Sequence, residues 1–460
     1  MGLAPSMEST VMHSINTDAQ LKNESKHGQL VNPSPNRSLD IIGAARTVFL
    51  LLSSTVLGSG LALITNLMLA KSMGPNGFGA FSASLVCVTL VSPLAGLGID
   101  LFLLKVFGQE GWSAQRWISP VLRFVCFSSF AVVGGLVFYS FVGHGGRPEL
   151  ILMMTPLVFA QVASMLACSK FQLEERYSQY AMLQSATSVL RFLGVFTVSA
   201  FFAISVTITA LIHGAVAVTI FIYALPKIKE LLSGHIHLKG HGRISEISYG
   251  PSPTVKDVAK GSWQFGMNGF LYLLYYQGSI VLLSSIVGER EAGEFNAVNL
   301  IIGASFLFPS VLFQRYLMPK LHRWSNSNLK ALQIVYSRGS LAMLVSGLAA
   351  GLIVFCFSAQ LIELLFGKSF EGSAPILALL SVCVPIRFLA APADAILTSG
   401  KQLIAKLRIL GFAAVLCLIL NVMLMPNWGI YAAAFSMILC EVYIAISLHV
   451  RALDFIRASY

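Results

Sequence analysis

The stretch "MGPNGFGAFSASL" at residues 73–85 has a counterpart far along the chain, "VGEREAGEFNAVNL" at residues 287–300. At an offset of 214 residues, the two stretches share four identities: Gly74/Gly288, Gly79/Gly293, Phe81/Phe295 and Ala83/Ala297. Chance recurrence of a glycine-bearing loop is one explanation, and duplication of a larger unit is the other. The pattern of apolar runs around each copy bears on this choice.

The chain is too apolar to be a soluble protein of its size. Of its 460 residues, 56% are hydrophobic and only 11% are charged, and the mean hydropathy is +0.75. So few charges cannot cover the surface of a soluble fold this large. Apolar runs between the charge clusters are long enough to cross the roughly 30 Å hydrocarbon layer as helices. The composition therefore predicts an all-α, polytopic membrane protein.

We expect about twelve transmembrane helices. The predicted spans are 47–70, 79–103, 118–142, 150–168, 181–203, 205–226, 263–287, 295–315, 340–358, 374–392, 407–425 and 429–450. The boundary between the fifth and sixth spans is the least distinct, because no glycine or proline marks a turn near "FFAISVT". All seven cysteines fall within or at the ends of apolar runs without metal-type spacing, which is typical of packing residues.

Lysine and arginine placement tests this topology independently, because cytoplasmic loops retain positive charge. With both termini in the cytoplasm, 25 of the 31 basic residues fall on the inner side and four on the outer side. The remaining two, Arg191 and Arg387, lie within spans. The net charge of +11 therefore reflects membrane topology. It gives no reason to expect nucleic-acid binding, since the basic residues are spread over many short loops.

The repeated stretch has the same place in two blocks of six spans. Each copy follows the first span of its block and leads into a span that contains a proline, Pro93 or Pro309. Two such blocks form a parallel repeat, typical of secondary transporters whose substrate site lies between the halves. The expected organisation is a disordered cytoplasmic tail (1–45), an N-lobe (46–226), a cytoplasmic linker (227–262), a C-lobe (263–452) and a short tail (453–460).

Three stretches carry a resemblance to a known family: "AKSMGPNGFGAFSASL", "LLFGKSFEGSAPILALLS" and "NWGIYAAAFSMILCEV". Over roughly residues 40 to 455, the chain resembles the Wzx-type lipid-linked oligosaccharide flippases of the multidrug/oligosaccharidyl-lipid/polysaccharide (MOP) exporter superfamily. The resemblance implies two six-helix lobes around a central cavity and a multi-pass protein of the cytoplasmic (inner) membrane. It also implies a cargo of undecaprenyl-pyrophosphate-linked sugar units for surface or exopolysaccharide assembly.

The two arginines within spans are candidates for contact with the cargo. A charge in hydrocarbon is costly, so a buried one usually faces a cavity or a partner. Guanidinium matches phosphate oxygens bidentately, and Arg191 and Arg387 could therefore bind the pyrophosphate. The alternative is a structural pair, for instance Arg387 with Glu441 of the twelfth span.

Polar residues at four-residue spacing form a stripe on one face of the seventh span: Gln264, Asn268, Tyr272 and Tyr276, with Gln277 beside it. Amides and tyrosines suit sugar hydroxyls, although hydrogen bonding between helices is the other interpretation. Members of the family often carry an acidic residue in this span. Gln277 occupies that neighbourhood here, so a cation-binding role is not carried over.

Three acidic residues are candidates for ion coupling: Glu441, Asp100 and Asp394. Asp100 and Asp394 lie near the inner ends of spans, where an ordinary interfacial carboxylate is the other interpretation. Glu441 is deeper, and is either a proton site or an arginine partner.

Two other functions compete with a flippase. A membrane-embedded glycosyltransferase or polymerase would need long outer loops with catalytic carboxylates, and every outer loop here is short. We therefore expect no enzyme activity. A multidrug exporter of the same superfamily is the second rival, but cationic drugs favour acidic cavities. No nucleotide-binding G-x-x-x-x-G-K-[ST] run occurs, so transport would be downhill or ion-coupled. We expect alternating access, with no cofactor and no metal. The implied partners are the lipid-linked oligosaccharide, membrane lipids and polysaccharide polymerase or export machinery, around a monomer.

Overall fold

The computed structural model describes residues 37–142, 147–238, 251–317, 321, 329–398 and 402–458. By its internal contacts the chain has two units, Met1–Phe49 and Leu50–Tyr460. The described part of the first unit is helical from Arg37 onward, although we expected a tail as far as residue 45. The rest of that tail lies outside the described residues. Every regular element in the described ranges is a helix, which confirms the all-α fold.

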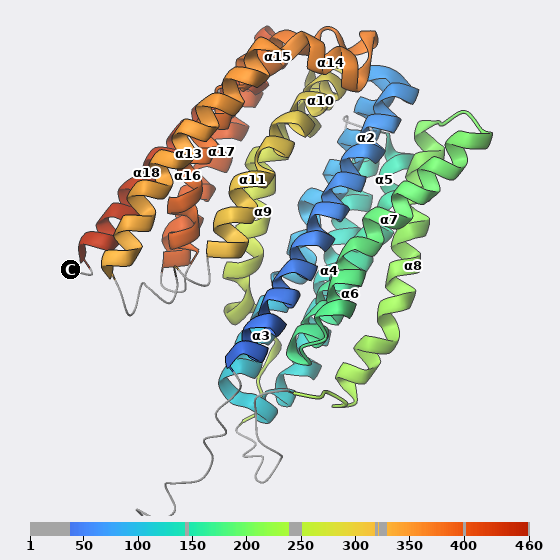
Figure 1. The fold of residues 1–460 in the computed structure, drawn as a ribbon. Coiled ribbons are helices and arrows are strands. Elements are labelled where there is room, and N and C mark those ends of the chain that lie inside the picture. Colours follow the sequence, from blue (N-terminus) through green and yellow to red (C-terminus); the bar gives the residue numbers. More distant parts are fainter. Residues whose placement is uncertain are drawn as a thin grey trace, which may run out of the picture. The chain divides into compact units, whose positions relative to one another are not determined.

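The N-terminal half runs from α2 to α8 and is drawn from blue to green in Figure 1. Its helices are α2 (Arg37–Gly96), α3 (Ile99–Glu110), η1 (Gly111–Trp117), α4 (Ile118–Val142), α5 (Pro148–Met154), α6 (Pro156–Leu173), α7 (Tyr177–Phe201) and α8 (Val206–Leu232). The turn between α7 and α8 is marked in the sequence by a helix-capping serine that our prediction did not use. The Ser205 hydroxyl accepts a hydrogen bond from the Ile208 N–H and caps α8.

Glycines, rather than loops, break the first helical stretch. At 1.5 Å per residue, the 60 residues of α2 would measure about 90 Å, far more than one membrane crossing. Gly74 interrupts it with φ 65° and ψ 180°, a conformation that residues with a Cβ rarely adopt. Pro75 follows, where a missing N–H costs nothing at the start of a new helical segment. A second break, at Leu97 and Gly98, separates α2 from α3.

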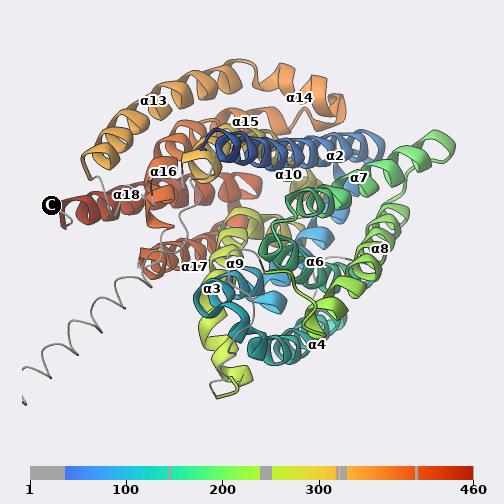
Figure 2. The same cartoon turned by 60° about the horizontal axis from the view of Figure 1, so that its bottom comes forward.

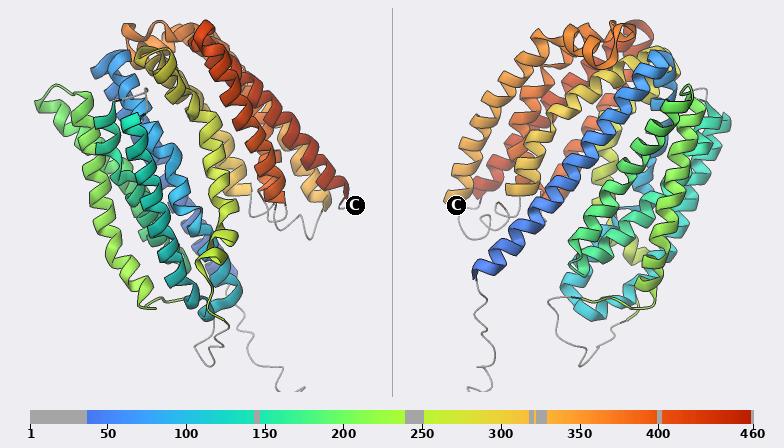
Figure 3. Two further views of the ribbon diagram at one scale, coloured as in Figure 1. Left: turned by 180° about the vertical axis from the view of Figure 1, so that it is seen from behind. Right: turned by 45° about the vertical axis from the view of Figure 1, so that its right-hand side comes forward.

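The C-terminal half runs from α9 to α18 and is drawn from yellow-green to red (Figure 1). Its elements are α9 (Val255–Ile286), α10 (Glu289–Ser305), α11 (Leu307–Pro309), the π-helical η2 (Ser310–Leu317), α13 (Leu329–Cys356), α14 (Ser358–Phe366), η3 (Lys368–Phe370), α15 (Ser373–Leu380), α16 (Cys383–Leu397), α17 (Leu403–Trp428) and α18 (Ile430–Ala458). Helices α17 and α18 pack side by side (Figure 3). Helix α9 also reaches α3 and α4 of the N-terminal half (Figure 2).

The two helices that flank the predicted linker extend into it. Helix α8 continues to Leu232, and α9 begins at Val255 behind a capping box. In this box the Thr254 hydroxyl accepts from the Asp257 N–H while the Asp257 carboxylate accepts from the Thr254 N–H. Residues 239–250 lie outside the described residues, and the linker 227–262 stays a prediction.

Ten helical stretches of the described chain are long and apolar enough to cross a membrane. The first, Phe49–Val142, has 94 residues, or about 140 Å at 1.5 Å per residue. It contains the first three spans that we predict, separated at Gly74 and at η1. A multi-pass membrane protein is confirmed, whereas the count of twelve spans stays a prediction.

The repeated glycines bring the two halves into backbone contact. A Cβ added to Gly79 would collide with the Glu289 carbonyl oxygen, and one added to Gly293 would collide with the Pro75 carbonyl oxygen. Glu289 and Pro75 are themselves counterparts at the 214-residue offset. Only glycine permits so close an approach. The contact is reciprocal, which agrees with the predicted repeat, and the two-lobe layout itself stays a prediction.

Further bonds join the halves at the same end of the bundle, which we call the glycine end. Asn296 Nδ2 donates to Ser82 Oγ over 2.8 Å, and these residues are also repeat counterparts. Arg147 forms a bidentate ion pair with Glu289, with N–O distances of 3.1 and 3.0 Å. Lys71 donates to the Leu364 carbonyl oxygen. Side-chain bonds thus reinforce the glycine contact.

Candidate functional site

The larger cavity, about 800 Å³ in volume, lies mainly in the C-terminal half. We call it the tyrosine cavity. Its polar or aromatic lining comes from α7, α9, α16, α17 and the α10–η2 region: Tyr180, Asn268, Tyr272, Tyr276, Gln277, Phe306, Ser310, Arg387, Asp394, Thr398 and Lys406. A cavity of this size, with aromatic walls and a few polar groups, suits a bulky organic ligand.

Most of the predicted stripe of the seventh span faces this cavity. Asn268, Tyr272, Tyr276 and Gln277 line it, whereas Gln264, one turn before Asn268, lines neither cavity described here. The Asn268 Oδ1 is buried and has no hydrogen-bond partner in the described part of the chain. An acceptor in that state is available to a ligand hydroxyl.

Two tyrosines form a stacked aromatic wall. The rings of Tyr272 and Tyr276 have centroids 5.8 Å apart and an interplanar angle of 16°. The Tyr276 hydroxyl donates to the Asn299 carbonyl oxygen over 3.2 Å, which fixes the ring. Phe306 packs beside Tyr276, with centroids 6.4 Å apart. This wall can stack on the apolar face of a sugar ring.

Arg387 reaches the tyrosine cavity but is already paired. Its Nη1 lies 3.5 Å from a carboxylate oxygen of the fully buried Glu441 and donates to the Tyr275 hydroxyl over 2.6 Å. That hydroxyl in turn donates to the other Glu441 oxygen, and the guanidinium lies over the rings of Tyr272 and Phe306. The structural pair that we gave as the alternative is therefore present.

A second ion pair lines the same cavity. Lys406 Nζ is 2.7 Å from the Asp394 carboxylate and donates to Thr398 over 3.0 Å. The sequence did not identify Lys406, because its short distance from a loop made it look like an ordinary cytoplasmic lysine. Asp100 lies elsewhere, in the first turn of α3, and lines neither cavity. Ion coupling at Glu441, Asp100 or Asp394 stays a prediction.

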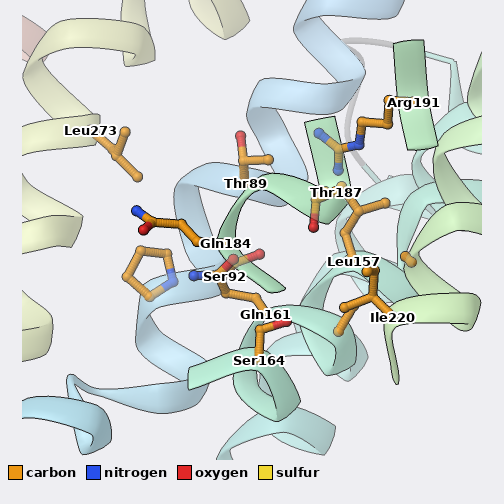
Figure 4. A pocket seen from close by; sticks show the side chains of 13 residues that line it. Thr89, Ser92, Leu157, Gln161, Ser164, Gln184, Thr187, Arg191, Ile220 and Leu273 are labelled. Carbon is orange, nitrogen blue, oxygen red and sulfur yellow. The ribbon is translucent and has the colours of Figure 1, made fainter. Parts of the chain in front are cut away.

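The second cavity, about 360 Å³, lies in the N-terminal half and contains the other span arginine. We call it the arginine cavity. Its thirteen lining residues include six with hydroxyl or amide groups and a single charged one, Arg191. The polar side chains around it are Thr89, Ser92, Gln161, Ser164, Gln184, Thr187 and Arg191 (Figure 4). Leu273 of α9 lines both cavities, which therefore adjoin.

A polar stripe on α7 connects the two cavities and was missed in the sequence. Tyr180 lines the tyrosine cavity, while Gln184, Thr187 and Arg191 line the arginine cavity. The spacing of four, three and four residues keeps all of them on one helical face. The signal was available in "YAMLQSATSVLR". Isolated hydroxyls and one amide in an apolar run are, however, a weaker indication of a binding face than two tyrosines at helical spacing.

Among the described residues, no group of three or more histidine, cysteine or acidic side chains could hold a metal ion. Both cavities are instead lined by groups that bind organic ligands through hydrogen bonds, stacking and charge.

The fold is that of membrane transporters of the MOP superfamily. Superposition on lipid II flippase MurJ in an inward closed conformation covers 89% of this chain and 90% of that one, with a TM-score of 0.64 and 14% identity. A multidrug resistance MATE family transporter of the MOP superfamily, in an inward-facing conformation, gives a TM-score of 0.65 at 13% identity, with 90% and 98% covered. A MOP superfamily transporter from Pyrococcus furiosus gives 0.58 at 12% identity, with 90% and 96% covered.

The sequence also matches a family model, described as polysaccharide biosynthesis protein, over residues 44–325. This is more than half of the chain, and the protein belongs to this family. The resemblance indicated by the three sequence stretches is thereby confirmed for family and fold. No curated protein matches the chain.

Proposed function

We propose that the protein is a secondary-type flippase that moves undecaprenyl-pyrophosphate-linked oligosaccharides across the cytoplasmic membrane for surface or exopolysaccharide assembly. The observation that carries this proposal is the pair of adjoining cavities, one with stacked tyrosines and one with an arginine. A lipid-linked sugar presents sugar rings and a pyrophosphate in the same molecule. Membership of a polysaccharide biosynthesis family supports this choice of cargo.

The charges of the cavities argue against the alternative, a multidrug exporter for cationic drugs. Such a cargo favours an unpaired carboxylate, and the only carboxylate among the described lining residues is Asp394. Asp394 is paired with Lys406. Glu441, just behind the cavity wall, is paired with Arg387. Neither acid is available to a cationic drug without loss of its basic partner.

In the proposed cycle, the halves rock about the cavities, and the polyprenyl tail stays in the lipid. Both termini are cytoplasmic, so the glycine end faces outward and must open to release the sugar. An inside-negative potential favours outward movement of the anion by about 2.3 kcal/mol per charge per 100 mV. Polymerase or export machinery then receives the product.

The test is extraction of lipid-linked glycans from cells with and without the gene. We expect the deletion to accumulate an undecaprenyl-linked unit on the inner leaflet and to lose a surface polysaccharide. Expression of the intact chain should reverse both effects. Unchanged glycans together with a higher sensitivity to cationic drugs would replace this proposal with the multidrug exporter.

A further inference from the structure

The two span arginines differ in what surrounds them. Arg387 is held by Glu441 and by the Tyr275 hydroxyl. The other cation of the tyrosine cavity, Lys406, is held by Asp394. A phosphate that bound to either cation would meet a carboxylate already paired with that cation, at 3.5 Å or 2.7 Å. The tyrosine cavity is therefore nearly neutral and has no free charge for an anion.

Arg191 is in the opposite state. In the described part of the chain it forms no ion pair or hydrogen bond, and its Nε is buried without a partner. No carboxylate is among the thirteen residues that line its cavity. A guanidinium near the middle of a membrane-spanning helix is costly when it lacks a counter-charge. The arginine cavity is thus incomplete without an anion.

The rest of the cavity lining matches an anion with many oxygens. Serine and threonine hydroxyls and glutamine amides supply neutral donors beside the guanidinium, with Thr187 one turn from Arg191 (Figure 4). Guanidinium and such donors are the groups that bind phosphate oxygens. The arrangement lacks the aromatic walls of the tyrosine cavity.

We infer that the arginine cavity is the pyrophosphate subsite, with Arg191 as its charged contact, and that the tyrosine cavity holds the sugars. The α7 stripe runs over twelve residues, a rise of about 16 Å, from Tyr180 beside the sugars to Arg191 beside the pyrophosphate. This assignment rests on the proposed function for the identity of the cargo. It reduces the predicted pair of pyrophosphate-binding arginines to one.

The test measures binding of geranylgeranyl pyrophosphate to the full-length protein in detergent. We expect the wild type to bind this probe and not geranylgeraniol, which has the same tail without phosphates. Arg191→Gln should weaken binding at least tenfold, which is about 1.4 kcal/mol. Inorganic pyrophosphate should compete with the probe for the wild type but not for Arg191→Gln. This result would show that the protein recognises the anion of the probe rather than its tail.

Two control variants isolate the subsite. Arg123→Gln removes an exposed arginine of α4 that lines neither cavity, and its binding should equal that of the wild type. The double variant Arg387→Met/Glu441→Leu removes the buried pair as a unit, which avoids leaving one charge unpaired. It should bind the probe within about threefold of the wild type, since the change is outside the pyrophosphate subsite.

Equal binding by the wild type and Arg191→Gln would overturn the assignment. So would a wild type that does not bind the probe, or a double variant that loses as much affinity as Arg191→Gln. Each of these results would leave the proposed function standing if the gene deletion still accumulates lipid-linked glycans. If the deletion leaves glycans unchanged, the proposed function itself fails.

Discussion

Gly79 and Gly293 occupy equivalent positions in the two halves and each packs against the backbone of the other half. Neither position has space for a Cβ, because a carbonyl oxygen of the other half lies where that atom would be: that of Glu289 at Gly79 and that of Pro75 at Gly293. The two glycines of the repeated stretch therefore permit this contact because they lack side chains. In the proposed cycle this contact opens and closes once per molecule moved.

Gly79→Ala should prevent the glycine end from closing. The added methyl group cannot be accommodated by rotation of a flexible side chain, because backbone atoms surround the site. Overpacking of this kind typically costs about 1–3 kcal/mol. We expect a lower unfolding midpoint and loss of lipid-linked oligosaccharide flipping in proteoliposomes. Gly134→Ala on α4 is the matched control, since its Cβ would meet nothing within 4 Å. If the two variants had the same unfolding midpoint and the same flipping rate, the proposed contact would be contradicted.

Ser82→Cys/Asn296→Cys, made in a background without the seven native cysteines, should lock the glycine end. The native side chains meet at 2.8 Å, so cysteines at these two positions lie on opposite sides of the same contact. Oxidised protein should stop flipping, and a reducing agent should restore it. Each single cysteine variant serves as a control. Full transport by the crosslinked protein would show that this end does not open.

The ion pair between Arg147 and Glu289 should contribute modestly to closure. The side chains are 47% and 29% exposed, and exposed pairs are worth about 0–1 kcal/mol. The bond to Glu289 raises the pKa of Arg147 above its already high ordinary value. Stability from a raised pKa is lost only as pH rises through that value, so neutral and mildly alkaline pH should have no effect on this arginine.

Salt should weaken this pair instead, through screening. Arg147→Glu should reduce flipping slightly, and Arg147→Glu/Glu289→Arg should restore it. A double-mutant cycle in low and high salt measures the coupling. A coupling energy that does not depend on salt would argue against an exposed ion pair.

Arg387 and Glu441 should behave as one unit in stability. Removal of either partner leaves a buried charge, and we expect a loss of about 3–5 kcal/mol from each single alanine variant. Arg387→Met/Glu441→Leu should be close to the wild type, because an apolar pair of similar volume often replaces a buried ion pair without loss. Thermal unfolding in detergent distinguishes these cases. Additive losses in the double variant would mean that the two residues are not coupled.

Tyr272→Ala should separate sugar recognition from pyrophosphate recognition. Loss of the ring removes the stack with Tyr276. Stacking of a nucleobase on an aromatic side chain, which we take as the analogue for a sugar face, is worth about 1–3 kcal/mol. Flipping of the lipid-linked oligosaccharide should fall roughly tenfold or more, while binding of geranylgeranyl pyrophosphate stays unchanged. Tyr276→Phe, which keeps the ring and loses only the bond to Asn299, should have a smaller effect. If Tyr272→Ala lost oligosaccharide flipping and geranylgeranyl pyrophosphate binding to the same extent, separate subsites would be contradicted.

Helical periodicity and composition predicted the helices and the polar face that α9 turns toward the tyrosine cavity. The four-residue spacing of Asn268, Tyr272 and Tyr276 was sufficient to identify one face of α9. Charge pairing was harder, because partners such as Asp394 and Lys406 come from different helices whose packing no local pattern reveals. The α7 stripe around Arg191 was missed because serine, threonine and glutamine occur in apolar helices for several reasons.

The reciprocal contact of Gly79 and Gly293 has the form of an isologous interface, in which the same patch occurs on both sides of a two-fold axis. Such an interface is what two separate copies of a six-helix unit would use to form a homodimer. A duplicated gene would inherit it ready-made, before any linker joined the copies. The cavities differ between the halves: one contains Arg191 and the other the stacked tyrosines. Once two copies are fused into one chain, each half can carry a different binding subsite.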